Sequence, residues 1–307
     1  MRAVWSFWSV PYAASAGLRW QSERYHLVAW VLSLMEARRH YSHTMLVTDT
    51  PGKVLLVERL GLPFEEVSTA LDTLANTPAH FWVLGKLYAY RQQTEPFFHL
   101  DTDVFLFQRL PEWLTSADFF AQNTETFDLD QNGYYRPDDI NKALVLTGGW
   151  RPSAWTWALE HHLNYAVNCG LIGGRRPEFL RSFAAEAIRL IEDPANQPAW
   201  KILGDLRSEN IIFEQYLLGA YLSYTQQGNG AGVHAPLRQA TLECRFLFSS
   251  MGEAFDEERS RQLGYTHLLG TAKSDSYLLG RIEARVKRDY PAYYERCERL
   301  LKTWKGW

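Results

Sequence analysis

The residues best suited to chemistry in this chain stand at the end of an apolar run. Residues 97–100 are followed by Asp101 and Asp103, two carboxylates separated by one residue. In a strand, residues i and i+2 point to the same side. Neighbouring carboxylates repel and are costly to desolvate unless a positive group lies between them. Mg²⁺ or Mn²⁺ would supply that charge, since such cations prefer oxygen ligands and leave positions open for phosphate. The alternative is a strand end whose acids cap a turn or face water.

The elements that must position this pair alternate along the first hundred residues. Strands are predicted at 3–8, 45–49, 64–67 and 97–100, and helices at 24–38, 53–60 and 82–92. This alternation predicts an α/β fold with a mostly parallel, Rossmann-like sheet flanked by helices. Ligands of such sheets bind beyond the carboxyl ends of the strands, where Asp49 and Asp101 stand.

The rest of the chain is predicted to be less regular. Residues 124–163 lose periodicity and are rich in Gly, Asn, Pro and aromatic residues, which indicates an irregular segment. This segment is either a loop that contacts a substrate or a structural flap packed by its own aromatic rings. A strand is expected at 165–173, followed by helices at 177–192 and 209–222 and a surface helix at 278–305.

Composition narrows the classes of partner and location. The chain has 307 residues and a net charge of −3 without a basic block, so nucleic acid is not an expected partner. We expect no transmembrane segment and no signal peptide, because the apolar runs are short. The cysteines Cys169, Cys244 and Cys297 lack CxxC spacing and are expected to be buried, reduced thiols of a cytoplasmic protein.

Four segments, taken in order, resemble the GT-A-type glycosyltransferases, most closely the glycogenin and galactosyltransferase-like retaining family. They are Asp101-x-Asp103, Asn168-x-Gly170, Glu214-Gln215 and His267-x-x-Gly270-x-x-Lys273. The resemblance implies a single GT-A catalytic domain over 1–307, made of a nucleotide-binding half (1–123), an acceptor and catalytic half (124–277) and a C-terminal helix (278–307). It also implies transfer of a hexose from a UDP-sugar, with retention, to a glycan, a lipid-linked acceptor or a small molecule.

The resemblance implies that the first and last motifs bind the metal and the diphosphate. The resemblance implies that Asp101, Asp103 and His267 hold Mn²⁺ or Mg²⁺. The imidazole suits a borderline metal such as Mn²⁺. Gly270 would let the backbone approach a phosphate, and Lys273 would place a positive charge against the diphosphate. The alternative for this segment is an ordinary glycine-containing turn.

The middle motifs are implied to lie near the sugar. Asn168 corresponds to the strand beside the donor sugar in the family, and Lys86 to a basic residue near the nucleotide-sugar. Glu214 or Gln215 would orient the sugar or stabilise its positive charge. A solvated helix acid is the alternative for Glu214.

The nucleoside site is the least defined by the resemblance. The first strand of the family commonly ends on Asp or Thr, whereas Ser6 and Trp8 stand at this place here. Ser6, Trp8 and Asp49 are therefore the candidates for holding the nucleoside. Ordinary packing at the strand ends is the alternative.

Another pattern resembles a calcium loop of the EF-hand kind. Residues 128–133 offer oxygen ligands at alternate positions before a glycine, and Asp139 follows. The last ligand position has Asp instead of the usual Glu, and a polar turn is the plainer interpretation.

Two other functions remain open at the level of sequence. A haloacid-dehalogenase-like phosphatase also carries Asp-x-Asp after an apolar strand, although no counterpart of that family's second acidic motif is found. The other is a non-catalytic protein of the same fold that binds a nucleotide-sugar or glycan.

Overall fold

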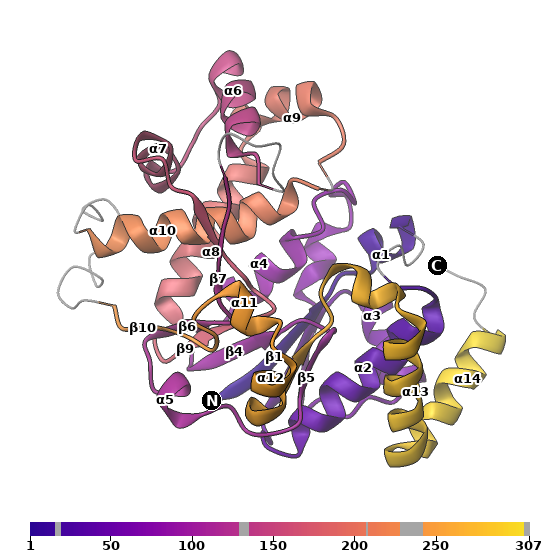
Figure 1. Cartoon of the computed structure of the whole chain (residues 1–307). Helices are drawn as coiled ribbons and strands as arrows, with labels where there is room; N and C mark the ends of the chain where they lie inside the picture. Colours follow the sequence, from indigo (N-terminus) through magenta and orange to yellow (C-terminus); the bar gives the residue numbers. More distant parts are fainter. Residues whose placement is uncertain (16–19, 129–134, 207, 228–241, 304–307) are drawn as a thin grey trace. The chain divides into compact units, whose positions relative to one another are not determined.

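The structure is a computed structural model, and it describes residues 1–15, 20–128, 135–206, 208–227 and 242–303 (Figure 1). The chain divides into two compact units. Unit 1 comprises Met1–Ala79, Phe98–Pro111 and Asp256–Trp307, and unit 2 comprises His80–Phe97 and Glu112–Phe255. The chain therefore leaves unit 1 and returns to it twice.

Unit 1 contains the parallel strands expected in the first hundred residues. They are β1 (Arg2–Phe7), β2 (Thr44–Thr48), β3 (Glu66–Ser68) and β4 (Phe97–Leu100), in the order β4-β1-β2-β3. β1 pairs in parallel with β2 and β2 with β3. Every residue of β2 and β4 is buried, which agrees with their mostly apolar sequence.

The helices of unit 1 follow the predicted periodicity. They include α1 (Ser9–Ser15), α2 (Glu23–Arg38), α3 (Thr50–Lys53) with the π-helical turn Val54–Arg59, and the 3₁₀ turn Ala70–Leu74. α2 is buried along most of its length and packs against β5 (Val104–Leu106). The predicted helices at 24–38 and 53–60 are thereby confirmed.

The C-terminal part of unit 1 differs from the single helix expected at 278–305. It consists of α12 (Glu257–Leu263), β11 (Tyr265–His267), the 3₁₀ turn Gly270–Ser274, α13 (Ser276–Asp289) and α14 (Pro291–Thr303). Pro291 separates α13 from α14, because proline cannot donate a helical hydrogen bond and disfavours a helical residue before it. Both helices pack against α2.

Unit 2 combines a short sheet with helices. Its strands β6 (Phe119–Ala121), β9 (Leu171–Gly174) and β10 (Cys244–Phe246) lie in the order β10-β6-β9, parallel between β10 and β6 and antiparallel between β6 and β9. The helices are α4 (Leu84–Arg91), α5 (Glu112–Thr115), α6 (Pro137–Thr147), α7 (Ser153–Glu160), α8 (Pro177–Glu192), α9 (Gln197–Leu203), α10 (Leu217–Gln226) and α11 (Met251–Ala254). A 3₁₀ turn spans Pro194–Asn196 and a π-helical turn spans Ile212–Tyr216.

Two predictions for unit 2 are wrong. The stretch 124–163, expected to be irregular, contains β7 (Thr124–Thr126), α6 and α7. α6 begins at Pro137 and ends before Gly148, whose φ of 69° is left-handed, and both are common helix-boundary signals. The strand expected at 165–173 is two strands, because β8 (Tyr165–Val167) pairs antiparallel with β7 and not with β6.

The observed fold is thus mixed α/β with mostly parallel strands and flanking helices, as expected, and it is compatible with a Rossmann-like arrangement. In the described part of the chain, no helix is both long and apolar enough to cross a membrane. Cys169 and Cys297 are buried free thiols as expected, whereas Cys244 is half-buried. Residues 129–134 of the calcium-loop pattern lie outside the described residues.

His26 is a titratable group in the core of unit 1. Its ring stacks on Tyr12 at 4.4 Å between centroids, and Trp30 Nε1 donates a hydrogen bond to His26 Nε2 at 3.1 Å. Burial lowers the pKa of His26 to about 3, and the positive charge of Lys273 acts in the same direction. His26 therefore stays neutral in the folded protein.

Acidification should destabilise unit 1 through this histidine. In the unfolded chain His26 titrates near pH 6.5. Between about pH 6.5 and pH 3 the unfolded state therefore binds a proton that the folded state does not, and the free energy of unfolding decreases as the pH decreases. His26→Gln keeps an acceptor for Trp30 but cannot titrate. We expect the loss of melting temperature between pH 7.5 and pH 5 to be smaller in this variant than in the wild type. An equal loss in both proteins would contradict the assignment.

Candidate metal centre

Asp101 and Asp103 lie on the turn that joins β4 to β5, not within a strand. β4 ends at Leu100, and the N–H of Val104 donates to the carbonyl of Asp101 at 3.0 Å, which closes the turn. The sequence-based argument from strand alternation is therefore wrong in its geometry. The turn brings the two carboxylates together instead, and both belong to unit 1.

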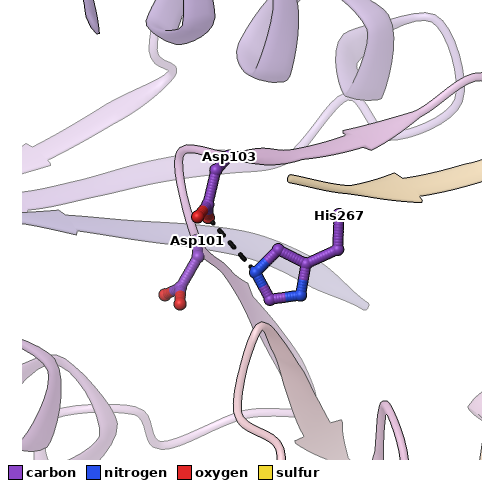
Figure 2. Close-up of side chains that lie close together, drawn as sticks. All are labelled: Asp101, Asp103 and His267. Atoms are coloured by element: carbon purple, nitrogen blue, oxygen red, sulfur yellow. Dashed lines mark ion pairs between the residues drawn. The ribbon is translucent and has the colours of Figure 1, made fainter. Parts of the chain in front are cut away.

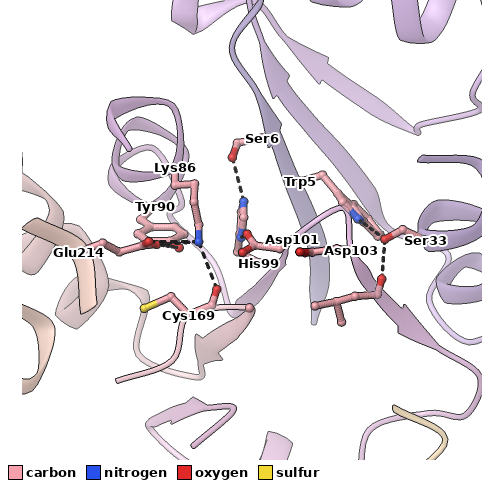
Figure 3. A network of polar contacts seen from close by, with 12 residues as sticks. Trp5, Ser6, Ser33, Lys86, Tyr90, His99, Asp101, Asp103, Cys169 and Glu214 are labelled. Carbon is pink, nitrogen blue, oxygen red and sulfur yellow. Dashed lines mark hydrogen bonds and ion pairs between the residues drawn. The ribbon is translucent and has the colours of Figure 1, made fainter. Parts of the chain in front are cut away.

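A buried chain of hydrogen bonds fixes the end of this turn. Trp5 Nε1 donates to Ser33 Oγ at 3.0 Å, and Ser33 Oγ donates to the carbonyl of Val104 at 2.8 Å (Figure 3). Trp5 and Ser33 are fully buried. The start of β5 is thus tied to both β1 and α2.

The antiparallel pairing of β11 with β5 delivers His267 to the same place. His267 lies opposite Val104 in the register of the two strands, and the N–H of Leu268 donates to the carbonyl of Asp103 at 2.9 Å. At the other end, the N–H of Phe107 donates to the carbonyl of Gly264 at 2.7 Å. Residues about 160 positions apart in the chain are thereby held side by side.

Asp101, Asp103 and His267 form a compact group of possible ligands. One ligand atom from each lies within 4.8 Å of the others (Figure 2). His267 Nε2 is 3.5 Å from Asp103 Oδ1, and Lys273 Nζ forms an ion pair with Asp103 Oδ2. The side chain of Asp103 is 6% exposed, whereas that of Asp101 is 29% exposed.

The electrostatics of the group keep Asp103 ionised. Burial alone would raise the pKa of Asp103, but the positive charge of Lys273 and the interaction with His267 outweigh it and hold the pKa far below its usual value. A buried carboxylate needs such a partner. Two carboxylates with an imidazole are a suitable donor set for Mn²⁺, so the residues fit a divalent cation.

The last motif continues from His267 into the 3₁₀ turn Gly270–Ser274. Gly270 has a left-handed φ of 52°, and nothing lies within 4 Å of the place where a Cβ would stand. The N–H of Gln21 donates to the carbonyl of Lys273 at 3.0 Å, and Lys273 Nζ lies 5.9 Å from the centre of the Trp20 ring. The backbone of this turn is therefore held in place beside open space.

The three nucleoside candidates of unit 1 have different surroundings. Asp49 is 4% exposed and accepts hydrogen bonds from Ser9 N at 3.0 Å, Ser9 Oγ at 2.5 Å and Gly52 N at 3.0 Å, so it caps α3. Ser6 Oγ lies 3.0 Å from His99 Nε2. Trp8 is 5% exposed, and its indole N–H has no hydrogen-bond partner among the described residues.

In unit 2, Lys86 and Glu214 form a buried ion pair. Lys86 Nζ is 2.9 Å from Glu214 Oε1 and 3.3 Å from the carbonyl of Cys169, and the hydroxyl of Tyr90 donates to Glu214 Oε1 at 2.6 Å (Figure 3). Glu214 is fully buried. Its carboxylate therefore serves Lys86 and Tyr90 instead of facing solvent as a helix acid would.

The adjacent Gln215 belongs to a different network of unit 2. Asn168 Nδ2 donates to Glu125 Oε1 at 2.6 Å, the Tyr135 hydroxyl donates to Glu125 Oε2 at 2.7 Å, and the same hydroxyl contacts Gln215 Oε1. The π-helical turn Ile212–Tyr216 presents Glu214 and Gln215 to these separate partners, as π-turns often do at functional sites.

Sequence reasoning missed several residues of these networks. Glu125 fell in the stretch interpreted as irregular, and only recognition of β7 could have placed it near Asn168. His99 and Tyr90 fell in segments that were correctly predicted, as a strand and a helix, but no role was assigned to either side chain. Each of these side chains contacts at least one predicted site residue.

The fold and the ligand group together define a mixed α/β protein with a candidate metal centre. The chain belongs to the Family of unknown function (DUF6734), whose family model matches residues 1–300. No curated protein matches the chain.

Gly264 should be essential for the pairing that positions His267. Its φ is 59°, and an added Cβ would stand 2.5 Å from Gln108 Cγ and 2.8 Å from Gln108 N. Gly264→Ala should lower the free energy of unfolding by about 1–2 kcal/mol from the left-handed conformation alone, and by more through the displaced strand. Gly280→Ala is the matched control, because a Cβ there meets nothing within 4 Å. Urea unfolding measures both, and equal stability of the two variants would contradict the argument.

The Lys86–Glu214 pair should show strong coupling. Lys86→Met leaves a buried carboxylate without its cation, and we expect a loss of about 3–5 kcal/mol in unfolding free energy. Glu214→Gln should cost a similar amount, while the double variant should cost less than the sum. A double-mutant cycle by urea unfolding measures this coupling. Additive losses would show that the pair contributes little.

Proposed function

We propose that the protein is a metal-dependent glycosyltransferase of the GT-A type. It transfers a hexose from a UDP-sugar, with retention of the anomeric configuration, to a glycan, a lipid-linked acceptor or a small molecule. The observation that carries the proposal is the group formed by Asp101, Asp103, His267 and Lys273. These residues come from the two motifs that resemble the family's metal and diphosphate site, and one ligand atom from each of the first three lies within 4.8 Å of the others.

The residues of unit 1 have complementary tasks in this proposal. Asp101, Asp103 and His267 hold Mn²⁺ or Mg²⁺, and a bound divalent cation stabilises the negative charge that develops on a departing diphosphate. Lys273 adds a positive charge for the diphosphate oxygens. The open space at Gly270 allows a phosphate to approach the backbone.

The nucleoside is assigned to Ser6 and Trp8, with Asp49 supporting them. The buried indole N–H of Trp8 offers a hydrogen-bond donor that pairs with no described residue. Asp49 contributes by fixing Ser9 and the start of α3 through its three hydrogen bonds.

The assignment of the hexose rests on the family resemblance of Asn168, Glu214 and Gln215. Asn168 and Gln215 lie in one hydrogen-bonded network with Glu125 and Tyr135, and amide groups are suited to orienting sugar hydroxyls. Glu214 acts indirectly, because its buried carboxylate holds Lys86. We place the reaction in the cytoplasm, where free thiols persist.

The test is turnover of a panel of nucleotide-sugars with and without Mn²⁺. Hydrolysis or transfer should require the metal, and Asp103→Ala and His267→Ala should each lower kcat/KM by about 100-fold or more. His43→Ala and Asp138→Asn are matched controls, since both residues are exposed. UDP with Mn²⁺ should also raise the melting temperature of the wild type more than other nucleotides do.

The outcomes separate the alternatives. Full activity in Asp103→Ala or His267→Ala would contradict the assignment of the metal centre. A UDP-dependent rise in melting temperature without any turnover would favour a non-catalytic nucleotide-sugar-binding protein. Phosphatase activity on simple phosphate esters without a nucleotide effect would favour the haloacid-dehalogenase-like alternative.

A further inference from the structure

His99 is a buried histidine beside the metal centre that no motif of the sequence accounts for. It lies on β4, is 1% exposed, and its Nε2 is 3.0 Å from Ser6 Oγ on the neighbouring strand β1 (Figure 3). The other ring nitrogen, Nδ1, is 3.8 Å from Asp101 Oδ1, which is close but longer than a hydrogen bond. The imidazole therefore stands between a hydroxyl and a candidate ligand carboxylate.

The chemistry of the contacts selects one arrangement of hydrogens. If the Ser6 hydroxyl donates to Nε2, the single hydrogen of the neutral imidazole lies on Nδ1 and faces Asp101. The opposite tautomer would turn the lone pair of Nδ1 toward the carboxylate, which is repulsive. We therefore infer that Ser6 donates to His99 and that the Nδ1–H of His99 faces Asp101.

Asp101 is the ligand that has most to gain from such a partner. Asp103 is nearly buried and already fixed by His267 and Lys273, whereas the side chain of Asp101 is 29% exposed. A partly exposed carboxylate loses rotational freedom when it binds a cation. Outer neighbours that orient a ligand in advance reduce this cost and raise metal affinity.

We propose that His99 is a positioning residue of the metal centre, which orients Asp101 through Nδ1 while Ser6 sets its tautomer through Nε2. The inference rests on the proposed function, because it requires that Asp101 bind a divalent cation. It assigns no contact between His99 and the cation or the substrate.

The test measures Mn²⁺ affinity alone, without nucleotide, by electron paramagnetic resonance of the free ion. Asparagine places its amide near the position of Nδ1, and glutamine places its amide near Nε2. His99→Gln, which keeps a partner for Ser6 but not for Asp101, should weaken Mn²⁺ binding about 10-fold. His99→Asn should weaken it less, and the melting temperatures of the two variants show whether both are folded.

A double-mutant cycle gives the decisive comparison. In an Asp101→Asn background, His99→Gln should change Mn²⁺ affinity little, because the residue on which His99 acts is already lost. His43→Gln, at an exposed site, is the control for a histidine replacement.

The results distinguish the two proposals. Wild-type protein that binds no Mn²⁺ would overturn both. Wild-type protein that binds Mn²⁺ with an unchanged affinity in His99→Gln, or an equal effect of His99→Gln with and without Asp101, would overturn the role of His99 and leave the proposed function standing.

Discussion

The candidate metal centre depends on the need to neutralise a carboxylate that the fold has buried. Asp103 lies on the turn just before β5, where its backbone carbonyl accepts a hydrogen bond from Leu268 at the end of β11 and its side chain is almost withdrawn from water. An unpaired charge there would be costly, and Lys273 and His267 supply the compensation. The carboxylate of Asp103 is therefore stabilised by two features of the fold. One is the pairing of β11 with β5, and the other is the path of the chain from His267 to Lys273.

The sequence was sufficient to predict the main elements of the fold and the residues of the candidate site, but not the local geometry of either. Apolar runs and turn residues were sufficient for the parallel strands β1, β2 and β4 and for α2 and α8, because these elements are long or fully buried. The motif spacing also brought His267 to Asp101 and Asp103. The turn at 101–103 was misjudged because strand alternation was extended beyond Leu100 as far as Asp103. α6 and α7 were missed because the Gly, Asn, Pro and aromatic residues around them suggested an irregular segment, although Pro137 and Gly148 marked the limits of α6.

The hydrogen-bond networks of unit 2 could be predicted from the sequence less well than the group around Asp103. That Glu214 and Gln215 serve different partners follows from a π-helical turn, for which the sequence has no dependable signal. The contact between Asn168 and Glu125 depends on the pairing of β7 with β8, two strands of three residues each. Such short strands are specified by their tertiary surroundings more than by their own residues.

Lys273 and a divalent cation at this centre would compete for the same carboxylate oxygens. In the structure the ammonium group is on Asp103, and its backbone is anchored to Gln21. An anion that draws the ammonium away would relieve this competition, so the affinities for cation and anion become reciprocally coupled. A cation at this centre would therefore bind more tightly in the presence of such an anion than in its absence.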